Sequence, residues 1–71
     1  MKRNELVVAD PKIMSGTPCF AGTRVPVQAL FDYLEAGDPL DEFLDNFPTV
    51  ARKKAIALLE KAKRELLAAA A

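Results

Sequence analysis

The chain has 71 residues with ten basic and ten acidic side chains, so its formal net charge is zero. A chain of this length makes one small domain, over residues 1–71, that buries only about 60 % of its unfolded surface and gains stability from a partner. One cysteine and no histidine exclude an internal disulfide, a Cys/His zinc site and a histidine general base, and the neutral balance lacks the basic excess of a committed nucleic-acid binder.

The sequence pattern carries no membrane or export signal. No apolar run approaches the roughly 20 residues that cross a bilayer, and residues 1–5 lead into no signal-peptide core. We therefore expect a cytoplasmic protein without membrane association. The residue types present also favour neither a cofactor site nor a metal site.

Residues 1–25 are expected to be extended. Leu6–Ala9 is short, apolar and rich in β-branched side chains, which predicts a strand that ends at Asp10. Phe20 and Val25 lie in a second extended piece, so we predict a small two-stranded ribbon. Such a ribbon is unstable alone and must pack on helices.

The segment 16–27 combines turn-forming and stiff residues immediately before a periodic helix. Glycine supplies the positive φ of tight turns, and each proline holds the preceding residue in an extended conformation. Rigid neighbours therefore position a single arginine, Arg24. Six residues of this segment and of the following helix are expected to shape the backbone and not to bind a ligand. They are Gly16, Pro18, Gly22, Thr23, Pro26 and Gly37.

Residues 26–71 are predicted to form a three-helix bundle. The first helix begins at Pro26, where the missing N–H of proline costs nothing, and ends at Gly37 in a left-handed stop. Its apolar residues recur at helical spacing and predict one buried stripe. They are Val27, Leu30, Phe31 and Leu34.

The second helix is predicted directly after this stop. Asp38 is its expected N-cap, Pro39 takes the first helical position, and the helix runs to about Asn46. Its buried side chains are expected to be Leu40, Phe43, Leu44 and Phe47.

Thr49 is the expected N-cap of the third helix, which continues to about Leu67 or beyond. Apolar residues that recur every three or four positions predict its buried face. They are Ala55, Leu59, Ala62 and Leu66, with Ile56 and Leu58 widening the face. This face is wider than one small core can cover, so we expect part of it to contact a second copy of the chain.

Charge is unevenly distributed along the chain. Residues 35–47 carry five acids and no base, whereas residues 48–71 carry six bases and two acids. Arg52, Lys53 and Lys54 lie in the first turns of the third helix, where the helix dipole disfavours cations. They either bind a phosphate or DNA, as in a helix-turn-helix protein, or form a solvated basic end that faces the acidic second helix of this or a neighbouring chain.

No set of side chains predicts catalysis. Arg24 either contacts a carboxylate or phosphate of a partner or anchors the ribbon by bonding within the fold. Cys19, between a proline and an aromatic residue, fits a small buried hydrophobe better than a nucleophile. The carboxylates of the second helix are most simply hydrated side chains that keep its end soluble, and not an acid/base pair. We therefore expect no catalytic residue and no enzyme activity.

Three blocks of sequence resemble a known family. They are Asp10–Ile13, Gly16–Val27 and Ala36–Pro48, which together cover most of residues 7–60. On these blocks the chain resembles the prokaryotic family called domain of unknown function 433. The resemblance implies a small, homeodomain-like domain of the helix-turn-helix type, with a strand-rich N-terminus and three helices.

The resemblance also implies a function. Many members of this family are regarded as antitoxins that are encoded beside a toxin resembling PIN-domain ribonucleases. By resemblance, this protein would bind and restrain such a toxin, form a homodimer and be able to repress its own operon. Gly22, Thr23 and Arg24 carry over as structural positions of the motif.

The last third of the chain departs from the family pattern. Arg52, Lys53 and Lys54 stand where relatives often carry an acidic or glutamine residue, and residues 55–71 have the composition used to strengthen designed helices. Three hypotheses follow, of which we prefer the first. They are a non-enzymatic antitoxin-like interaction domain, a DNA-binding regulator that uses the third helix, and an engineered self-assembling scaffold derived from the family.

Overall fold

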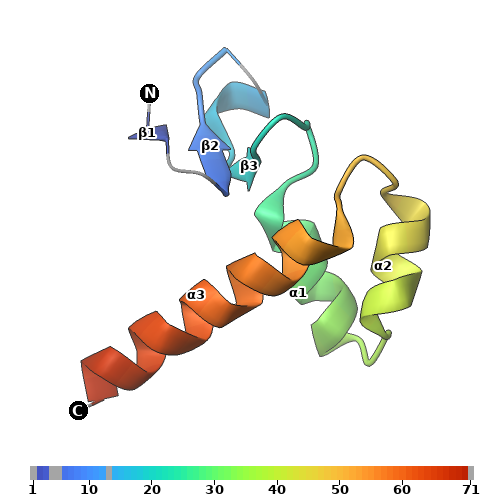
Figure 1. Cartoon of the computed structure of the whole chain (residues 1–71). Helices are drawn as coiled ribbons and strands as arrows, with labels where there is room; N and C mark the ends of the chain where they lie inside the picture. Colours follow the sequence, from blue (N-terminus) through green and yellow to red (C-terminus); the bar gives the residue numbers. More distant parts are fainter. Residues whose placement is uncertain (1, 4–5, 13, 71) are drawn as a thin grey trace.

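Short strands precede three helices in the computed structural model, which describes residues 2–3, 6–12 and 14–70. The fold-class prediction is confirmed, because the molecule is mainly helical and its described strands all lie in the N-terminal segment (Figure 1). The elements in chain order are β1 (Lys2–Arg3), β2 (Val7–Ala9), the 3₁₀ turn η1 (Met14–Gly16), β3 (Cys19–Phe20), α1 (Val27–Glu35), α2 (Leu40–Asn46) and α3 (Arg52–Ala70).

The predicted ribbon is present and has one more strand than expected. β2 pairs antiparallel with β3, with Val7 opposite Phe20, and β1 pairs antiparallel with the other edge of β2. The Asp10 carboxylate accepts the backbone N–H of Lys12 at 2.9 Å just after β2, as expected for a turn-forming aspartate. Both residues of β3 are buried, so the ribbon is stabilised by the helices against which it packs.

The start of α1 is tied to the ribbon. The prediction that Pro26 takes the first helical position is wrong by one residue, because Pro26 is the cap residue, with the extended φ and ψ of −63° and 138°, and the first helical residue is Val27. The N–H of Val27 donates to the carbonyl of Pro18 at 3.0 Å. The two prolines therefore fix the direction in which α1 leaves the ribbon. Leu30, from the predicted apolar stripe, is fully buried.

The end of α1 is as predicted, but the start of α2 is not. Gly37 has a φ of 88°, and the N–H of Asp38 donates back to the carbonyl of Tyr33 at 2.9 Å, which completes a Schellman motif. This bond holds Asp38 in the end of α1, so the prediction that it caps α2 is wrong. Pro39 is instead the cap residue, in an extended conformation, and α2 begins at Leu40 without a side-chain cap.

The prediction that Thr49 caps α3 is also wrong. Val50 is only 4 % exposed, and its N–H donates to the carbonyl of Phe47 at 3.0 Å in a turn. Burial of this side chain keeps residues 48–51 out of the helix. α3 therefore begins at Arg52, and the carbonyl of Ala51 accepts the first helical hydrogen bonds.

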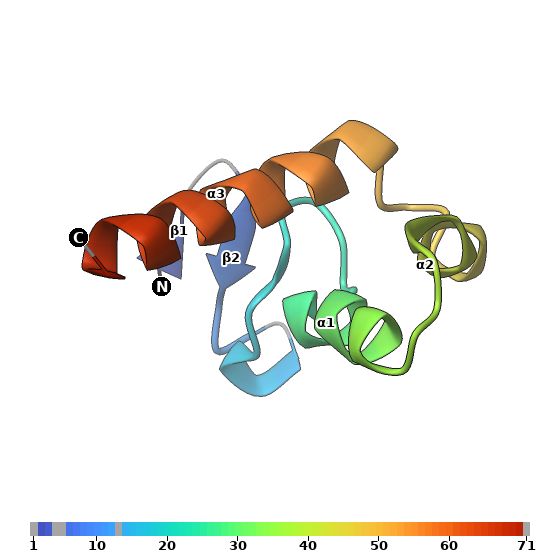
Figure 2. The ribbon, with the colours of Figure 1, turned by 90° about the horizontal axis from the view of Figure 1, so that it is seen from below.

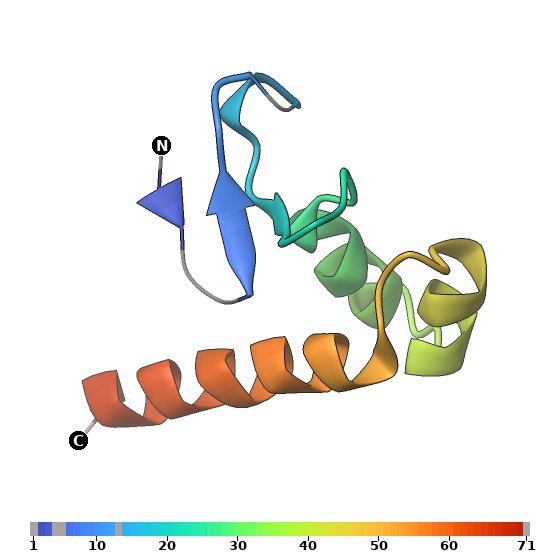
Figure 3. The same cartoon turned by 45° about the horizontal axis from the view of Figure 1, so that its top comes forward.

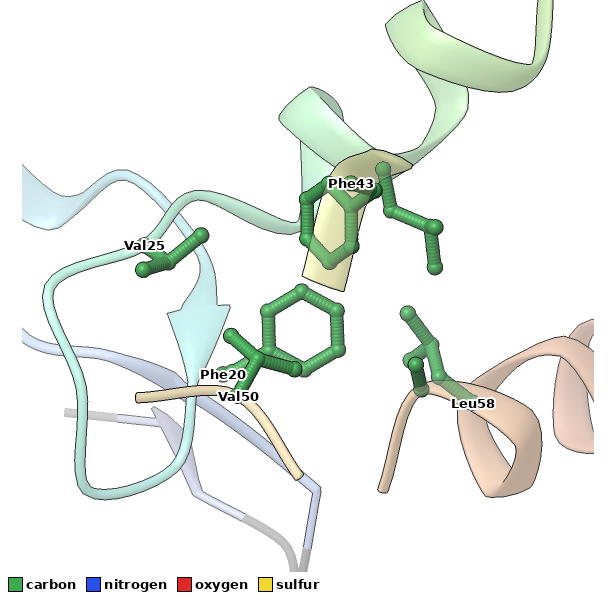
Figure 4. Close-up of a cluster of buried hydrophobic side chains, with 7 residues drawn as sticks. Phe20, Val25, Phe43, Val50 and Leu58 are labelled. Carbon is green, nitrogen blue, oxygen red and sulfur yellow. The ribbon is translucent and has the colours of Figure 1, made fainter. Parts of the chain in front are cut away.

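The core gathers one or two side chains from each of the longer elements. Phe43 of α2 is completely buried, and its ring lies 6.0 Å from that of Phe20, 5.6 Å from that of Tyr33 and 5.0 Å from that of Phe47. Figure 4 shows Phe20, Phe43 and Leu58 pointing toward one another from three different elements. The buried cluster is Phe20, Val25, Leu30, Phe43, Val50, Ala55 and Leu58.

Only the first turns of α3 cover this core. Ala55 and Leu58 are buried as predicted, whereas Ile56 is 44 % exposed, Leu66 is 72 % exposed and Leu67 is 65 % exposed. The prediction that Ile56 and Leu66 belong to the buried face is therefore wrong. Leu66 is exposed because the C-terminal half of α3 runs past α1 and away from α2 (Figures 1 and 3). Ile56 lies in the first turns, between the buried Ala55 and Leu58, and is exposed because it points to another side of the helix than these two residues. α3 lies along one side of the molecule, with α1 opposite its first half (Figure 2).

Candidate interaction surface

The motif that precedes α1 folds into a tight turn between Phe20 and Val25. Gly22 has a φ of 78°, a value that residues with a side chain rarely adopt. The N–H of Thr23 donates to the carbonyl of Phe20, and the N–H of Phe20 donates to the carbonyl of Val25, both at 3.0 Å. The hydroxyl of Thr23 also donates to the Phe20 carbonyl at 2.9 Å and accepts the N–H of Val25 at 3.0 Å. The Gly-Thr pair therefore forms the turn and holds it rigid.

Arg24 is the last residue of this turn before Val25, and it is exposed. Over residues 2–3, 6–12 and 14–70, no hydrogen bond or ion pair involves its guanidinium group. The sequence leaves two interpretations of Arg24 open. For one of them, anchoring of the ribbon, the described residues show no contact that Arg24 makes within the fold. A rigid turn that presents an unpaired guanidinium to solvent suits a contact with another molecule.

The basic triplet at the start of α3 is divided by the fold. Arg52 forms an exposed ion pair with Asp41 of α2, as the prediction of a basic end facing the acidic second helix expects. Lys53 and Lys54 are exposed, and neither has an ion pair among the described residues. Two of the three cations are therefore available to a ligand or a partner.

A small hollow lies between the turn and the start of α3. Its volume is about 20 Å³, which suits one water molecule. It is lined by Leu6, Phe20, Ala21, Thr23, Thr49, Val50, Ala51 and Lys54. The turn that carries Arg24 and the first turn of α3 thus border one place, although they are about thirty residues apart in the sequence. We call Arg24, Lys53 and Lys54 the basic edge.

The other motif positions have structural roles that the sequence predicts only in part. Cys19 is 1 % exposed, and its thiol donates to the carbonyl of Thr17 at 3.3 Å, which agrees with a small buried residue. Gly16 ends η1 with a φ of 86°, but Met14 and Ser15 also have positive φ values, of 51° and 56°. No pattern in the sequence marks these two residues as left-handed, because neither is a glycine or an asparagine.

The described residues offer neither a metal-binding cluster nor a membrane-spanning helix. Over 2–3, 6–12 and 14–70, no group of three or more Cys, Asp or Glu side chains is placed to hold a metal ion. In the same part of the chain, no helix has the length and apolar character needed to span a membrane.

Comparison with known proteins places the chain among relatives of unknown function. The family model described as a protein of unknown function, DUF433, matches residues 7–60. An uncharacterized protein of Sinorhizobium fredii, y4eO, is 36 % identical over 50 residues, which are 70 % of this chain and 23 % of that protein. The chain thus spans less than a quarter of the length of this relative. No solved structure matches the chain.

The family match covers β2, β3, α1, α2 and the first half of α3, whereas β1 precedes it. It includes the turn with Gly22, the Schellman glycine Gly37 and all three residues of the basic edge, whereas residues 61–71 lie beyond it. The chain belongs to the DUF433 family of proteins of unknown function.

Proposed function

We propose that this chain is a non-enzymatic interaction domain of the antitoxin type, which binds and restrains a nuclease-like protein encoded beside it and which acts as a homodimer in the cytoplasm. The observation that carries the proposal is the basic edge, where Arg24 on a rigid turn and Lys53 and Lys54 on a helix are exposed and unpaired among the described residues.

The charge of the edge favours an acidic protein surface as its target. Cations that approach from two rigid elements need little ordering when they bind, and complementary charge gives specificity and fast association. Arginine adds a planar fork of donors that fits a carboxylate. The partner surface is therefore expected to present carboxylates at the place where Arg24 and Lys54 meet it.

Co-expression of the chain with the neighbouring nuclease-like protein tests this proposal. We expect the two proteins to co-purify, and we expect Arg24→Glu combined with Lys54→Glu to weaken the complex at least about tenfold, because two attractive contacts become repulsive. The dissociation constant, measured by isothermal titration calorimetry at two salt concentrations, gives the effect.

Lys61→Glu is the control for this charge reversal, because Lys61 is an exposed cation in the second half of α3. Its complex with the nuclease-like protein should keep the natural dissociation constant. The proposal fails if the neighbour forms no complex with the folded natural chain, or if Lys61→Glu weakens the complex as much as the reversal at Arg24 and Lys54.

DNA is the second candidate partner, because Lys53 and Lys54 lie at a helix start, where a helix-turn-helix protein contacts base edges. The first turn of α2 opposes this candidate. Its Asp41 is exposed and pairs with Arg52 at the start of α3, the adjacent Glu42 is also exposed, and both carboxylates would repel phosphates. A DNA-binding regulator would be retained on its operator at low salt and would lose affinity steeply as salt rises. Lys53→Glu with Lys54→Glu should abolish that retention, and no retention of the natural chain at low salt rejects the candidate.

A further inference from the structure

One exposed stripe of α3 carries, in order along the helix, an apolar, an acidic, a basic and an apolar side chain. Ile56, Glu60, Lys63 and Leu67 lie four, three and four positions apart, which places them on one face of an α-helix. All four are exposed. The ammonium group of Lys63 lies 3.2 Å from a carboxylate oxygen of Glu60, so these two charged groups are side by side on that face. We call these four residues the α3 stripe.

We propose that the α3 stripe is the surface on which a second copy of this chain docks, with the two α3 helices antiparallel and a two-fold axis between residues 61 and 62. This inference rests on the homodimer of the proposed function. It adds which surface forms the dimer interface and that the two α3 helices run antiparallel. In such a symmetric pair, the same patch is used by both copies and must be complementary to itself.

The α3 stripe meets this requirement in the antiparallel direction. The two-fold axis places Ile56 opposite Leu67 of the second copy, and Glu60 opposite Lys63 of the second copy. Each apolar side chain therefore meets an apolar one, and each acid meets a base. In a parallel, in-register pair, Glu60 would face Glu60 and Lys63 would face Lys63, and like charges at such positions are destabilising. The order of the residues thus selects one direction of pairing.

A second pair of leucines extends the contact on one flank of the α3 stripe. Leu59 is half-buried and Leu66 is 72 % exposed, and the two lie seven residues apart on the same flank of the helix. The same two-fold axis brings Leu59 within about 3 Å, measured along the helix axis, of Leu66 of the second copy. The pairing would cover Ile56, Leu66 and Leu67, the three exposed large apolar side chains of α3.

The fold leaves this face accessible in the part of the chain that the structure describes. The second half of α3 extends beyond α1 and α2 in two views (Figures 1 and 3). Lys63 and Leu67 lie beyond residues 7–60, which the family model matches. The proposed pairing is therefore a property of this chain and not one that family membership supplies.

Charge exchange on the α3 stripe tests the contact. We expect Glu60→Lys alone and Lys63→Glu alone each to raise the dimer dissociation constant at least about tenfold, because each substitution acts twice in a symmetric pair. Combining both substitutions in one chain restores an acid opposite a base, so the double variant should lie within about threefold of the natural value. Sedimentation velocity over a concentration series measures the constant, with far-UV circular dichroism as the check on folding.

Lys61→Glu is the matched control, because it makes the same charge change as Lys63→Glu and also removes one ion pair within the helix, that with Glu65. Lys61 lies on the opposite face of α3 from the α3 stripe, so this variant should dimerise like the natural chain. Equal loss at Lys61 and Lys63, or a double variant as weak as either single one, would overturn the proposed contact.

Disulfide trapping tests the direction. In an antiparallel pair, a mixture of Ile56→Cys and Leu67→Cys chains should cross-link across the interface, whereas Ile56→Cys alone should not, because its two copies lie about 16 Å apart along the helices. The natural chain, whose Cys19 is buried, should stay uncross-linked. Cross-linking of Ile56→Cys with itself would instead show a parallel pair and overturn the proposal.

The outcome for the α3 stripe is separable from that for the basic edge. A chain that sediments as a monomer at high micromolar concentration, yet co-purifies with the nuclease-like protein, would overturn the stripe proposal and leave the proposed partner binding intact. If the nuclease-like protein protects Leu66 and Leu67 from solvent, this face of α3 binds that protein and not a second copy of the chain, and the stripe proposal is overturned. A dimer that responds to the charge exchange as predicted, but whose chains fail to bind the nuclease-like protein, would support the stripe proposal and reject the partner.

Discussion

Phe43→Ala is expected to lower the free energy of unfolding by about 3–5 kcal/mol, the cost of removing a large side chain from a core that cannot close around the gap. Phe43 is completely buried and contacts the rings of Phe20, Tyr33 and Phe47. A domain of this size has a total stability of only about 4–10 kcal/mol. The variant should therefore be partly or wholly unfolded at 25 °C, as urea titration followed by circular dichroism would show.

Phe31→Ala is the control for this experiment. Phe31 has the same side chain but is only half-buried, at the edge of the core on α1. Its truncation removes less contact and leaves no closed cavity, so a loss of about 1–2 kcal/mol is expected. Equal losses at Phe31 and Phe43 would mean that Phe43 does not lie at the centre of the core.

Leu58→Ala is expected to cost about 2–4 kcal/mol, whereas Leu66→Ala should change the stability of the monomer by less than about 0.5 kcal/mol. The two leucines lie on the same helix, but Leu58 is 6 % exposed and Leu66 is 72 % exposed. The helix propensities change equally in the two variants, so the difference between them measures burial alone.

Thermal or urea unfolding at low micromolar protein concentration measures this difference without a contribution from self-association. A similar loss for both variants would show that α3 packs on the body of its own chain along its whole length. At high protein concentration, Leu66→Ala should additionally lose the stabilisation that a second copy provides.

The sequence predicts the end of α1 correctly and its start to within one residue, because both boundaries depend on local chemistry. Gly37 forms the left-handed end of the helix, and Pro26 takes the last position before it. Both residues act through their own backbone, without help from distant parts of the chain. The Gly22 turn is predictable for the same reason.

The two wrong cap assignments share a physical cause. Asp38 and Thr49 both have the side chains that commonly cap helices, but backbone contacts set by other residues take precedence. The Asp38 N–H completes the end of α1, and the burial of Val50 delays the start of α3. Sequence periodicity equally overestimates the buried face of α3, because it shows which residues share a face and not how far the core extends beneath them.

The basic edge could be predicted only as separate pieces. The sequence marks Arg24 as rigidly held and marks Arg52, Lys53 and Lys54 as unfavourably placed at a helix start. The ion pair of Arg52 with Asp41 depends on how the start of α3 lies beside α2. The hollow shared by the Arg24 turn and Lys54 depends on how the start of α3 lies beside the ribbon. Contacts of this kind, between segments far apart in the chain, leave no local pattern in the sequence.

The most direct test of the proposed function is the activity of the nuclease-like neighbour, titrated with the folded chain. We predict that its cleavage of RNA stops at a fixed molar ratio of the two proteins, and that the Arg24→Glu, Lys54→Glu chain must be present at a concentration at least about tenfold higher for the same inhibition. Unchanged cleavage in the presence of excess natural chain would contradict the account.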